Sequence, residues 1–377
     1  MTGRTPPIKP FSFDLTEAEI EEFQQGAADI LRSGTLILGE YTARFERAFA
    51  DYVGSTHAVS VNSGSSALEF LLRIKQVSGK VVLVPTNTNF ATVASVIRAG
   101  GTVQYLDMDP KTFAPTFDMV ERAFSRRPDL AGVLWVHIGG IISPEFPSVV
   151  EWCRARGAFV IEDAAHAHGS QIGGSKSGTL ADGAAFSFFP TKVMTTCEGG
   201  MITTDREEEA NSARSYRNQG KRGMNYGGLH HDFGNSSRMT EMNALLGLIQ
   251  LRKLPAMLER RALVAGAITR ELDRAGLSYC STAHMERASH YKLIVLLPPG
   301  RSLNAVKQAL ANEGVSTGGG VYEIPCHQQP VFEQISKGVA LPNAERWCSN
   351  HLCPPVTSAM TAEDGRFVGE MLVKALA

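Results

Sequence analysis

The sequence has almost no excess of charge of either sign. Its 37 Lys and Arg residues nearly balance 38 Asp and Glu residues, which leaves a formal net charge of -1 at pH 7. Proteins that bind nucleic acid or a membrane surface through charge carry a strongly basic face. The balance therefore argues against both kinds of partner.

Long apolar runs and paired cysteines are lacking as well. No run reaches the about 18 apolar residues that a membrane-spanning helix needs. Residues 1–7 carry one basic residue and no apolar block follows them, so we expect no secretory signal. The six cysteines are scattered without close-paired spacing, which predicts reduced thiols and no zinc site. These absences favour a cytoplasmic protein without a metal.

What the chain does have is a regular alternation of apolar runs and helical patterns. Of its 377 residues, 43% are hydrophobic, enough to bury one large core and a smaller second one. Strands that alternate with helices are typical of an α/β fold with a parallel sheet. We expect strands at 58–61, 81–84, 103–106, 131–137, 158–162, 183–188 and 200–204, and intervening helices at 65–75, 91–99, 117–125 and 147–156.

The second half of the chain has a different pattern. Residues 220–236 are rich in glycine, asparagine and histidine and show little periodicity, which predicts a long irregular segment. A helix is expected over 238–254, where Pro255 interrupts it, and a further helix follows to about Ala275. Beyond it, a strand at 290–297 and helices at 303–313 and 362–376 predict a small α+β domain. We therefore expect a large domain over 1–254 and a small one over 255–377.

A lysine stands where solvated lysines are rarely found. Lys192 ends the run Ser187-Phe-Phe-Pro-Thr-Lys, directly after a buried-looking strand, and Glu198-Gly-Gly follows it. Another apolar strand ends in Asp163, with His166 close behind. The carboxyl ends of such strands meet at one edge of the sheet. A lysine amine can form a Schiff base with a carbonyl cofactor, and an acid can bind a ring nitrogen, so the pattern predicts a site for such a cofactor.

A turn between a predicted strand and helix, Ser63-Gly-Ser-Ser66, is a candidate phosphate site. Backbone N–H groups and hydroxyls at a helix N-terminus bind phosphate without a cationic residue. By itself such a turn is weak evidence, because the same residues also serve as an ordinary helix cap.

Several motifs in a fixed order resemble the DegT/DnrJ/EryC1/StrS family of PLP-dependent sugar aminotransferases. The resemblance implies the PLP-dependent transferase fold of type I, with a mostly parallel seven-stranded sheet between helices and a small C-terminal α+β domain. It covers nearly the whole chain and rests on residues 33–39, 45–46, 63–68, 162–166, 187–192, 325–327 and 341–346.

The resemblance implies roles for the residues of the predicted site. Lys192 matches the lysine that holds pyridoxal 5'-phosphate (PLP) as a Schiff base and moves a proton in both half-reactions. Asp163 matches the carboxylate that keeps the pyridine nitrogen protonated. His166 corresponds to a residue beside the cofactor ring. The phosphate is expected at Gly64, Ser65 and Ser187.

Two departures from the family pattern concern the cofactor. Many members carry asparagine two residues before the arginine that corresponds to Arg238, where this chain has Ser236 and the asparagine is Asn235. Either residue could contact the cofactor phosphate of a neighbouring subunit, which implies a homodimer with the site at its interface. Many members also place an aromatic residue against the ring where this chain has Asn89, and we expect Phe90 to point away.

The resemblance also implies the reaction and its substrates. We expect ping-pong transfer of an amino group from an amino acid, most simply glutamate, to a nucleotide-linked keto-deoxysugar in the synthesis of a natural product or surface glycan. Arg238, Tyr322 and His327 are the candidate substrate-binding residues, and the glycines at 318–320 predict a mobile approach to the pocket.

Three other functions stay open. A keto-cyclitol could replace the sugar, or the cofactor could serve a sugar dehydratase, although dehydratases with histidine in place of the Schiff-base lysine are disfavoured by Lys192. A non-catalytic PLP-binding regulator is the third alternative. A regulator that contacts DNA should show a basic patch or helix-turn-helix, and the sequence has no obvious candidate for either.

Overall fold

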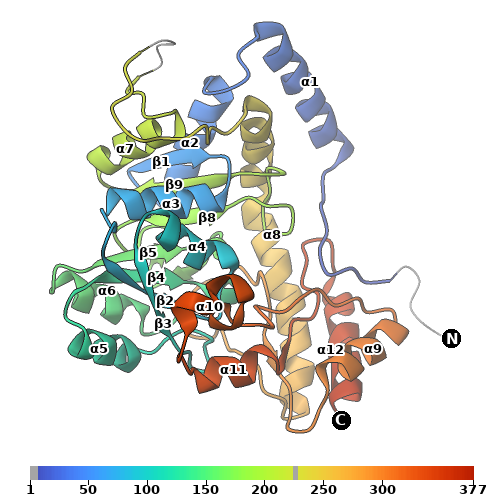
Figure 1. The fold of residues 1–377 in the computed structure, drawn as a ribbon. Helices are drawn as coiled ribbons and strands as arrows, with labels where there is room; N and C mark the ends of the chain where they lie inside the picture. The colour runs from blue at the N-terminus through green and yellow to red at the C-terminus, as the bar shows by residue number, and fades with distance from the viewer. Residues whose placement is uncertain (1–6, 224–227) are drawn as a thin grey trace.

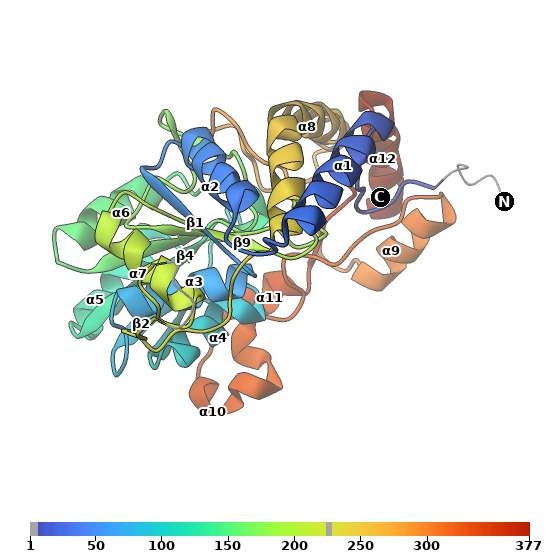
Figure 2. The same ribbon diagram turned by 90° about the horizontal axis from the view of Figure 1, so that it is seen from above.

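The computed structural model describes residues 7–223 and 228–377 and places a seven-stranded sheet between two layers of helices (Figures 1 and 2). The strand order is β1-β9-β8-β5-β4-β2-β3. Strand β9 is antiparallel to its neighbours β1 and β8, and the other neighbouring pairs are parallel. The strands are β1 His57–Val61, β2 Val81–Pro85, β3 Thr102–Leu106, β4 Leu130–Val136, β5 Phe159–Asp163, β8 Ala184–Ser187 and β9 Gly200–Thr204. This confirms the predicted mostly parallel sheet.

Each face of the sheet has its own hydrophobic core. Because successive strand residues point to opposite faces, β2 contributes Val82 and Val84 to one core and Val81 and Leu83 to the other. One face is covered by α3 Gly64–Ile74, α4 Phe90–Arg98 and α7 Glu207–Arg217, and the other by α2 Glu40–Val53, α5 Phe117–Arg126, α6 Phe146–Arg154 and the first part of α8.

The first helix, α1 Glu17–Ser33, has a capping motif at each end. Thr16 and Glu19 form a capping box at its start, and Gly34 ends it in the left-handed conformation with φ of 70°. In Figure 1 this helix stands out from the body of the molecule beside α8.

Helix α8 does not end at Pro255, contrary to the prediction. It runs unbroken from Glu241 to Arg274, with Thr240 as its N-cap. Pro255 is exposed, whereas Leu254, Met257 and Leu258 beside it are buried against α2 and the sheet. Burial of this stripe holds the helix together where proline removes a backbone donor. The expected domain boundary at 254–255 falls inside α8, and the division of the chain there stays a prediction.

The C-terminal part contains less strand than predicted. Of residues 290–297, only β10 Val295–Leu296 is a strand, paired with β11 His351–Leu352. The preceding carbonyls, those of Ser289, His290 and Tyr291, instead accept hydrogen bonds from the buried Arg261 side chain. The remaining helices are α9 Leu303–Asn312, α10 Glu333–Ser336, α11 Pro342–Cys348 and α12 Ala362–Leu376, and α12 packs along the second half of α8.

The segment 220–236 is irregular, as predicted, in the part that the structure describes. Isolated bridges join Asn218 to Ser236 and Lys221 to His230, and residues 224–227 of the prediction lie outside the described residues. Within the described chain, every helix is too short or too polar to cross a bilayer.

Candidate active site

A cavity of about 430 Å³ lies at the carboxyl edge of the sheet. The ends of β5 and β8, the first turns of α3 and α4, and Tyr322 from the C-terminal part supply its walls. Eight of the residues predicted for the site line it: Gly64, Ser65, Asn89, Asp163, His166, Ser187, Lys192 and Tyr322. Parallel strands bring these residues together from positions far apart in the sequence.

Asp163 is the last residue of β5 and is only 5% exposed. One carboxylate oxygen accepts a hydrogen bond of 2.8 Å from the Thr92 hydroxyl, and the other accepts one of 3.2 Å from the backbone N–H of Ala165. Burial raises the pKa of Asp163, against the lowering effect of these donors. A cationic N–H in the cavity would offset that cost, which is what a protonated pyridine nitrogen provides.

Lys192 lies in the turn after β8, where its backbone N–H donates to the Phe189 carbonyl at 2.9 Å. Burial lowers the pKa of its ammonium to about 8, although the negative charge of Asp163 acts in the opposite direction. About a tenth of the amine is therefore neutral at pH 7, far more than for an ordinary lysine. The neutral form is the one that attacks a carbonyl.

The predicted phosphate end is formed where α3 begins. Ser63 caps the helix by accepting from the backbone N–H of Ser66, and the geometry of a helix start leaves the N–H groups of Gly64 and Ser65 without intrahelical acceptors. A Cβ on Gly64 would lie 2.8 Å from Cβ of Ser187, so only glycine lets these two segments approach. The result is a cradle of backbone donors and hydroxyls that fits a phosphate.

His166 is buried and held in one tautomer. The backbone N–H of Gly139 donates to its Nδ1 at 3.3 Å, so Nε2 carries the proton and faces the Tyr322 hydroxyl at 3.3 Å. Its ring stacks on Tyr291, with ring centroids 4.2 Å apart. Burial lowers the pKa of His166 well below its ordinary value, so it acts as a neutral hydrogen-bond donor near neutral pH.

The cavity wall at the start of α4 contains Asn89 in place of an aromatic ring. Asn89 caps α4, and its side-chain oxygen accepts from the backbone N–H of Ala91 at 2.9 Å. Phe90 stacks on Phe332 instead, with centroids 5.5 Å apart, and does not line the cavity. Phe90 thus points away from the cavity, although the prediction assumed an extended segment and Phe90 is the first residue of helix α4.

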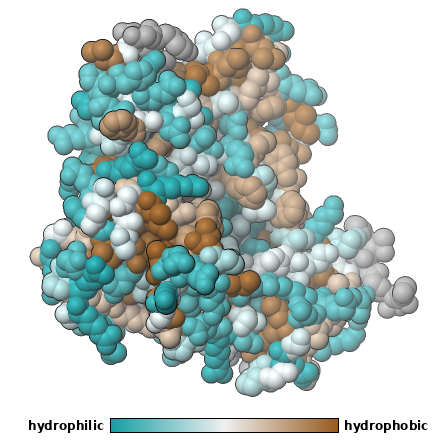
Figure 3. Space-filling model, in the orientation of Figure 1, coloured by the Kyte–Doolittle hydropathy of each residue, from teal (hydrophilic) through white to brown (hydrophobic). Residues whose placement is uncertain are grey.

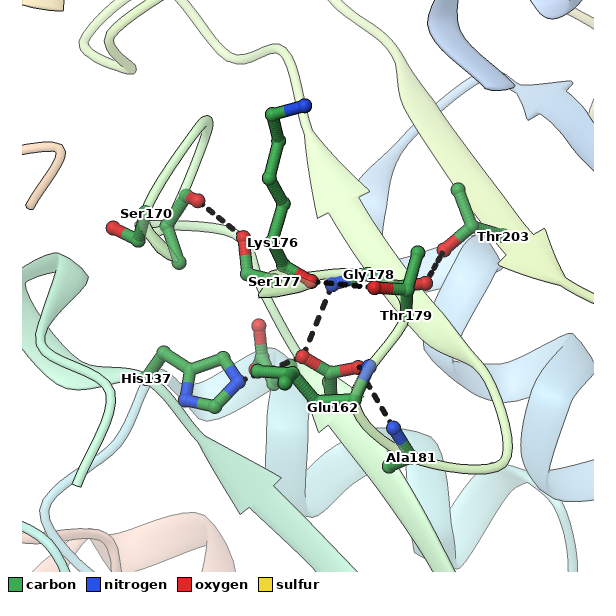
Figure 4. Close-up of polar contacts among 12 residues, drawn as sticks. His137, Glu162, Ser170, Lys176, Ser177, Gly178, Thr179, Ala181 and Thr203 are labelled. Atoms are coloured by element: carbon green, nitrogen blue, oxygen red, sulfur yellow. Dashed lines mark hydrogen bonds and ion pairs between the residues drawn. The ribbon is translucent and has the colours of Figure 1, made fainter. Parts of the chain in front are cut away.

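Glu162, next to Asp163, points to the opposite face of β5. Its carboxylate holds the loop of residues 178–181 in place (Figure 4). This fully buried carboxylate contacts Nε2 of His137 at 2.9 Å. It also accepts from the backbone N–H groups of Gly178, Leu180 and Ala181 at 3.0, 2.9 and 3.2 Å. The network anchors the end of β5 and so positions Asp163.

Two predicted residues, Asn235 at the end of the irregular segment and Arg238 just after it, lie away from the cavity of their own chain. Asn235 is exposed and its side-chain oxygen accepts from the backbone N–H of Ser236, while Arg238 donates to the Asn218 side chain at 3.0 Å. Neither lines the cavity. Their predicted contact is with the site of a neighbouring subunit, and it stays a prediction.

His327 is likewise not among the residues that line the cavity. Its Nδ1 lies 2.7 Å from the Thr86 hydroxyl, and its Nε2 lies 3.1 Å from a carboxylate oxygen of Glu345. The backbone N–H of Cys326 also donates to the Thr86 carbonyl at 2.7 Å. These contacts fix the segment that carries Tyr322 against the turn after β2. Substrate binding by His327 stays a prediction, and in the structure the residue supports this segment.

Several site residues were missed from the sequence. Thr88 and Thr92 form a buried hydroxyl chain to Asp163, with 2.8 Å between the two hydroxyls, and their spacing of one helical turn was the available signal. Tyr291 and Lys292 come from the segment that was assigned to a strand, and no motif marked them.

Comparison with known proteins identifies the family of the chain. The DegT/DnrJ/EryC1/StrS aminotransferase family matches residues 17–373. The chain belongs to this family. Membership confirms the resemblance found in the motifs, and with it the prediction of an aminotransferase.

Several relatives of this chain carry the names of nucleotide-sugar aminotransferases. The dTDP-4-dehydro-2,3,6-trideoxy-D-glucose 4-aminotransferase of Saccharopolyspora spinosa is 31% identical, over 93% of this chain and 92% of its own. The UDP-N-acetyl-3-dehydro-alpha-D-glucosamine 3-aminotransferase of Acidithiobacillus ferrooxidans is 32% identical, over 83% and 82%.

A solved relative shows the same fold. The PLP form of Spr1654, a putative sugar aminotransferase from Streptococcus pneumoniae, superposes with a TM-score of 0.86 at 27% identity and covers 98% of both chains. A structure of its PMP form matches equally well, with a TM-score of 0.87. The predicted fold is thus confirmed.

Proposed function

We propose that this protein is a PLP-dependent aminotransferase that transfers the amino group of an amino acid, most simply L-glutamate, to a nucleotide-linked keto-deoxysugar. The observation that carries the proposal is the meeting of Lys192, Asp163 and the Gly64–Ser65 cradle in one cavity. Membership in the family, and the PLP and PMP forms of a solved relative, support it.

The residues present fit PLP at three separate points. The cradle at Gly64, Ser65 and Ser187 would hold the phosphate, and Asp163 would bind the ring nitrogen. Lys192 would attach through its amine. When bound, the cofactor supplies an electron sink that stabilises negative charge on the substrate carbon.

The side chains around the cavity would each have a separate role in the reaction. The hydroxyl of Thr92 and the N–H of Ala165 stabilise the negative charge of Asp163 against the effect of burial, and the charged carboxylate would favour a protonated ring nitrogen. Lys192, with a pKa of about 8, can accept and return a proton at the substrate carbon near neutral pH. His166 donates through Nε2 to the Tyr322 hydroxyl, which also lines the cavity, and would orient it.

The active enzyme is, in this proposal, a cytoplasmic homodimer with each site at the subunit interface. Asn235 and Arg238 would reach the neighbouring cavity, since neither lines that of its own chain. Apolar residues gather over α1 and the neighbouring part of α8 in Figure 3. The exposed hydrophobic residues of these helices are Leu31 in α1 and Leu263 in α8, at 65% and 63% exposure. Such a surface suits burial by a second copy.

A panel of acceptors tests the proposal and settles the substrate class. Nucleotide-linked 3-keto and 4-keto sugars and cyclitol ketones are incubated with the PLP-loaded protein and glutamate, and the amine product is measured by mass spectrometry. We expect a sugar amine. Amination of cyclitols alone would overturn the sugar assignment, and loss of water without amination would identify a dehydratase.

A further inference from the structure

A second cavity of about 340 Å³ adjoins the candidate cofactor site. His166, Lys192 and Tyr322 line both cavities, so the reactive amine can be approached from either one. The other walls of this second cavity come from the N-terminal segment, the turn after β8, α8 and the C-terminal part. The residues are Pro10, Phe11, Ser12, Thr191, Val193, Arg261, Tyr291, Lys292, Gly318 to Val321, and Val356 to Ser358. None of the residues of the phosphate cradle lines it.

Lys292 is a cation of this second cavity to which the proposed chemistry has assigned no role. Lys192 and Arg261 also line it, but Arg261 donates from Nε and Nη2 to the carbonyls of Ser289, His290 and Tyr291 at 2.7–3.2 Å. The Lys292 side chain forms no ion pair or hydrogen bond with the described residues. It is half-buried, with Nζ 5.6 Å from the centroid of the Tyr291 ring.

A half-buried ammonium without a carboxylate partner carries a desolvation cost. Burial lowers the pKa of Lys292, which reflects that cost. An anionic ligand would remove it by supplying a charge-assisted hydrogen bond. The ammonium of Lys192 also lies over the Tyr291 ring, 4.9 Å from its centroid, and both lysines line the second cavity, so an anion at Lys292 would share that cavity with the reacting amine.

We propose that Lys292 binds a carboxylate of the amino-acid donor in the second cavity, an inference that rests on the proposed aminotransferase function. The α-carboxylate of an amino acid is one bond from the carbon that carries the amine. It therefore arrives beside Lys192 together with that amine. The diphosphate of a nucleotide-linked sugar is separated from the keto carbon by part of the sugar ring, and so lies farther from Lys192.

The neighbouring glycines keep the Lys292 ammonium accessible. A Cβ on Gly318 would lie 3.2 Å from Nζ of Lys292 and 3.2 Å from Cβ of Pro10. A side chain at this position would therefore occupy the space beside the ammonium. The hydroxyl residues Ser12 and Ser358 line the same cavity and offer further donors to a carboxylate.

Binding of an unreactive donor analogue tests the inference without turnover. Glutarate has two carboxylates and no amine, and its affinity for PLP-loaded protein is measured by calorimetry. We expect Lys292→Ala to weaken it by about tenfold to a hundredfold, and Lys292→Arg to retain most of it, because a charged hydrogen bond is lost only in the first variant.

Lys176→Ala is the matched control. Lys176 is also half-buried, with Nζ 5.2 Å from the centroid of Tyr52, but it donates to the Tyr52 carbonyl and does not line the second cavity. This variant should bind glutarate like the wild type. A similar loss in both variants, or no glutarate binding by the wild type, would overturn the inference.

The two half-reactions then separate the donor from the sugar. In Lys292→Ala the Kd for glutamate should rise at least about tenfold, while reaction of the PMP-loaded protein with the sugar stays within about twofold. The reverse pattern would assign Lys292 to the sugar nucleotide and refute the proposal. If the wild type transfers no amine at all, the proposed function fails, whereas the glutarate measurement still decides the role of Lys292.

Discussion

At the scale of single residues, burial shifts the protonation of Lys192 and Asp163 in opposite senses. It lowers the pKa of the lysine to about 8 and raises that of the acid. Burial therefore raises the free energy of the charged form of each residue unless a ligand compensates for the charge. An aldehyde that takes up the amine and a cationic ring nitrogen that faces the acid satisfy both requirements at once.

The shifted lysine makes the reaction of the apoprotein with PLP depend on pH in a defined way. The folded-state pKa of Lys192 lies below the ordinary value of 10.5, so the neutral amine becomes dominant as pH rises through about 8. We expect the rate of appearance of the Schiff-base absorption band to rise from pH 6 to 8 and to level off above about pH 9. A rate that keeps rising beyond pH 10 would show an unshifted lysine.

Site residues could be predicted from the sequence where a recognisable motif stands at or after the end of a predicted strand. Lys192, Asp163 and Ser65 each follow a clear apolar strand, so both their chemistry and their place at one sheet edge could be inferred. Lys292 and Tyr291 carried no such signal. They reach the site because Arg261 binds the backbone of their segment, and a long-range contact of this kind leaves no local pattern.

At the scale of elements, the start of α3 depends on a close approach that only glycine permits. In Gly64→Ala the new methyl group would lie 2.8 Å from Cβ of Ser187, so the cradle must open. We expect PLP affinity to fall by about tenfold or more, measured by titration of the apoprotein. Gly266→Ala in α8 is the control, since its nearest neighbour would lie 3.7 Å away. Equal PLP affinity in both variants would contradict the cradle.

A second prediction at the scale of elements concerns Pro255 in helix α8. Pro255 is exposed and has no backbone N–H, so Pro255→Ala restores one helical hydrogen bond and disturbs no buried contact. We expect the free energy of unfolding to rise by about 1–3 kcal/mol, measured by urea denaturation. A destabilised variant would show that α8 needs the proline geometry. The sequence alone suggested a break here because local propensity is visible in it and tertiary burial is not.

At the scale of the whole molecule, the alternation of strands and helices was sufficient to predict the sheet. All seven strands were expected close to their observed positions, because each buried strand is a short apolar run, and helices separate most of the strands along the chain. The elements of the C-terminal part were harder to predict, since its short strands and turns depend on contacts that are distant in the sequence.

Complementation between inactive variants tests the shared site. Lys192→Ala removes the reactive amine, and Arg238→Ala removes a group proposed to act in the neighbouring subunit. Mixed dimers then have one intact site, so co-expressed variants should recover up to about a quarter of wild-type activity. The pair Lys192→Ala and Asp163→Asn should recover none, because both residues line the cavity of one chain. No recovery with the first pair would place each site within a single chain.

The most direct test of the central claim is the absorption spectrum of the purified protein supplied with PLP, before and after addition of glutamate. We predict a band at the edge of the visible and near-ultraviolet range that glutamate bleaches, and no such band in Lys192→Ala. A band that persists in Lys192→Ala, or its absence from the wild type, would contradict the assignment of Lys192 as the residue that holds the cofactor.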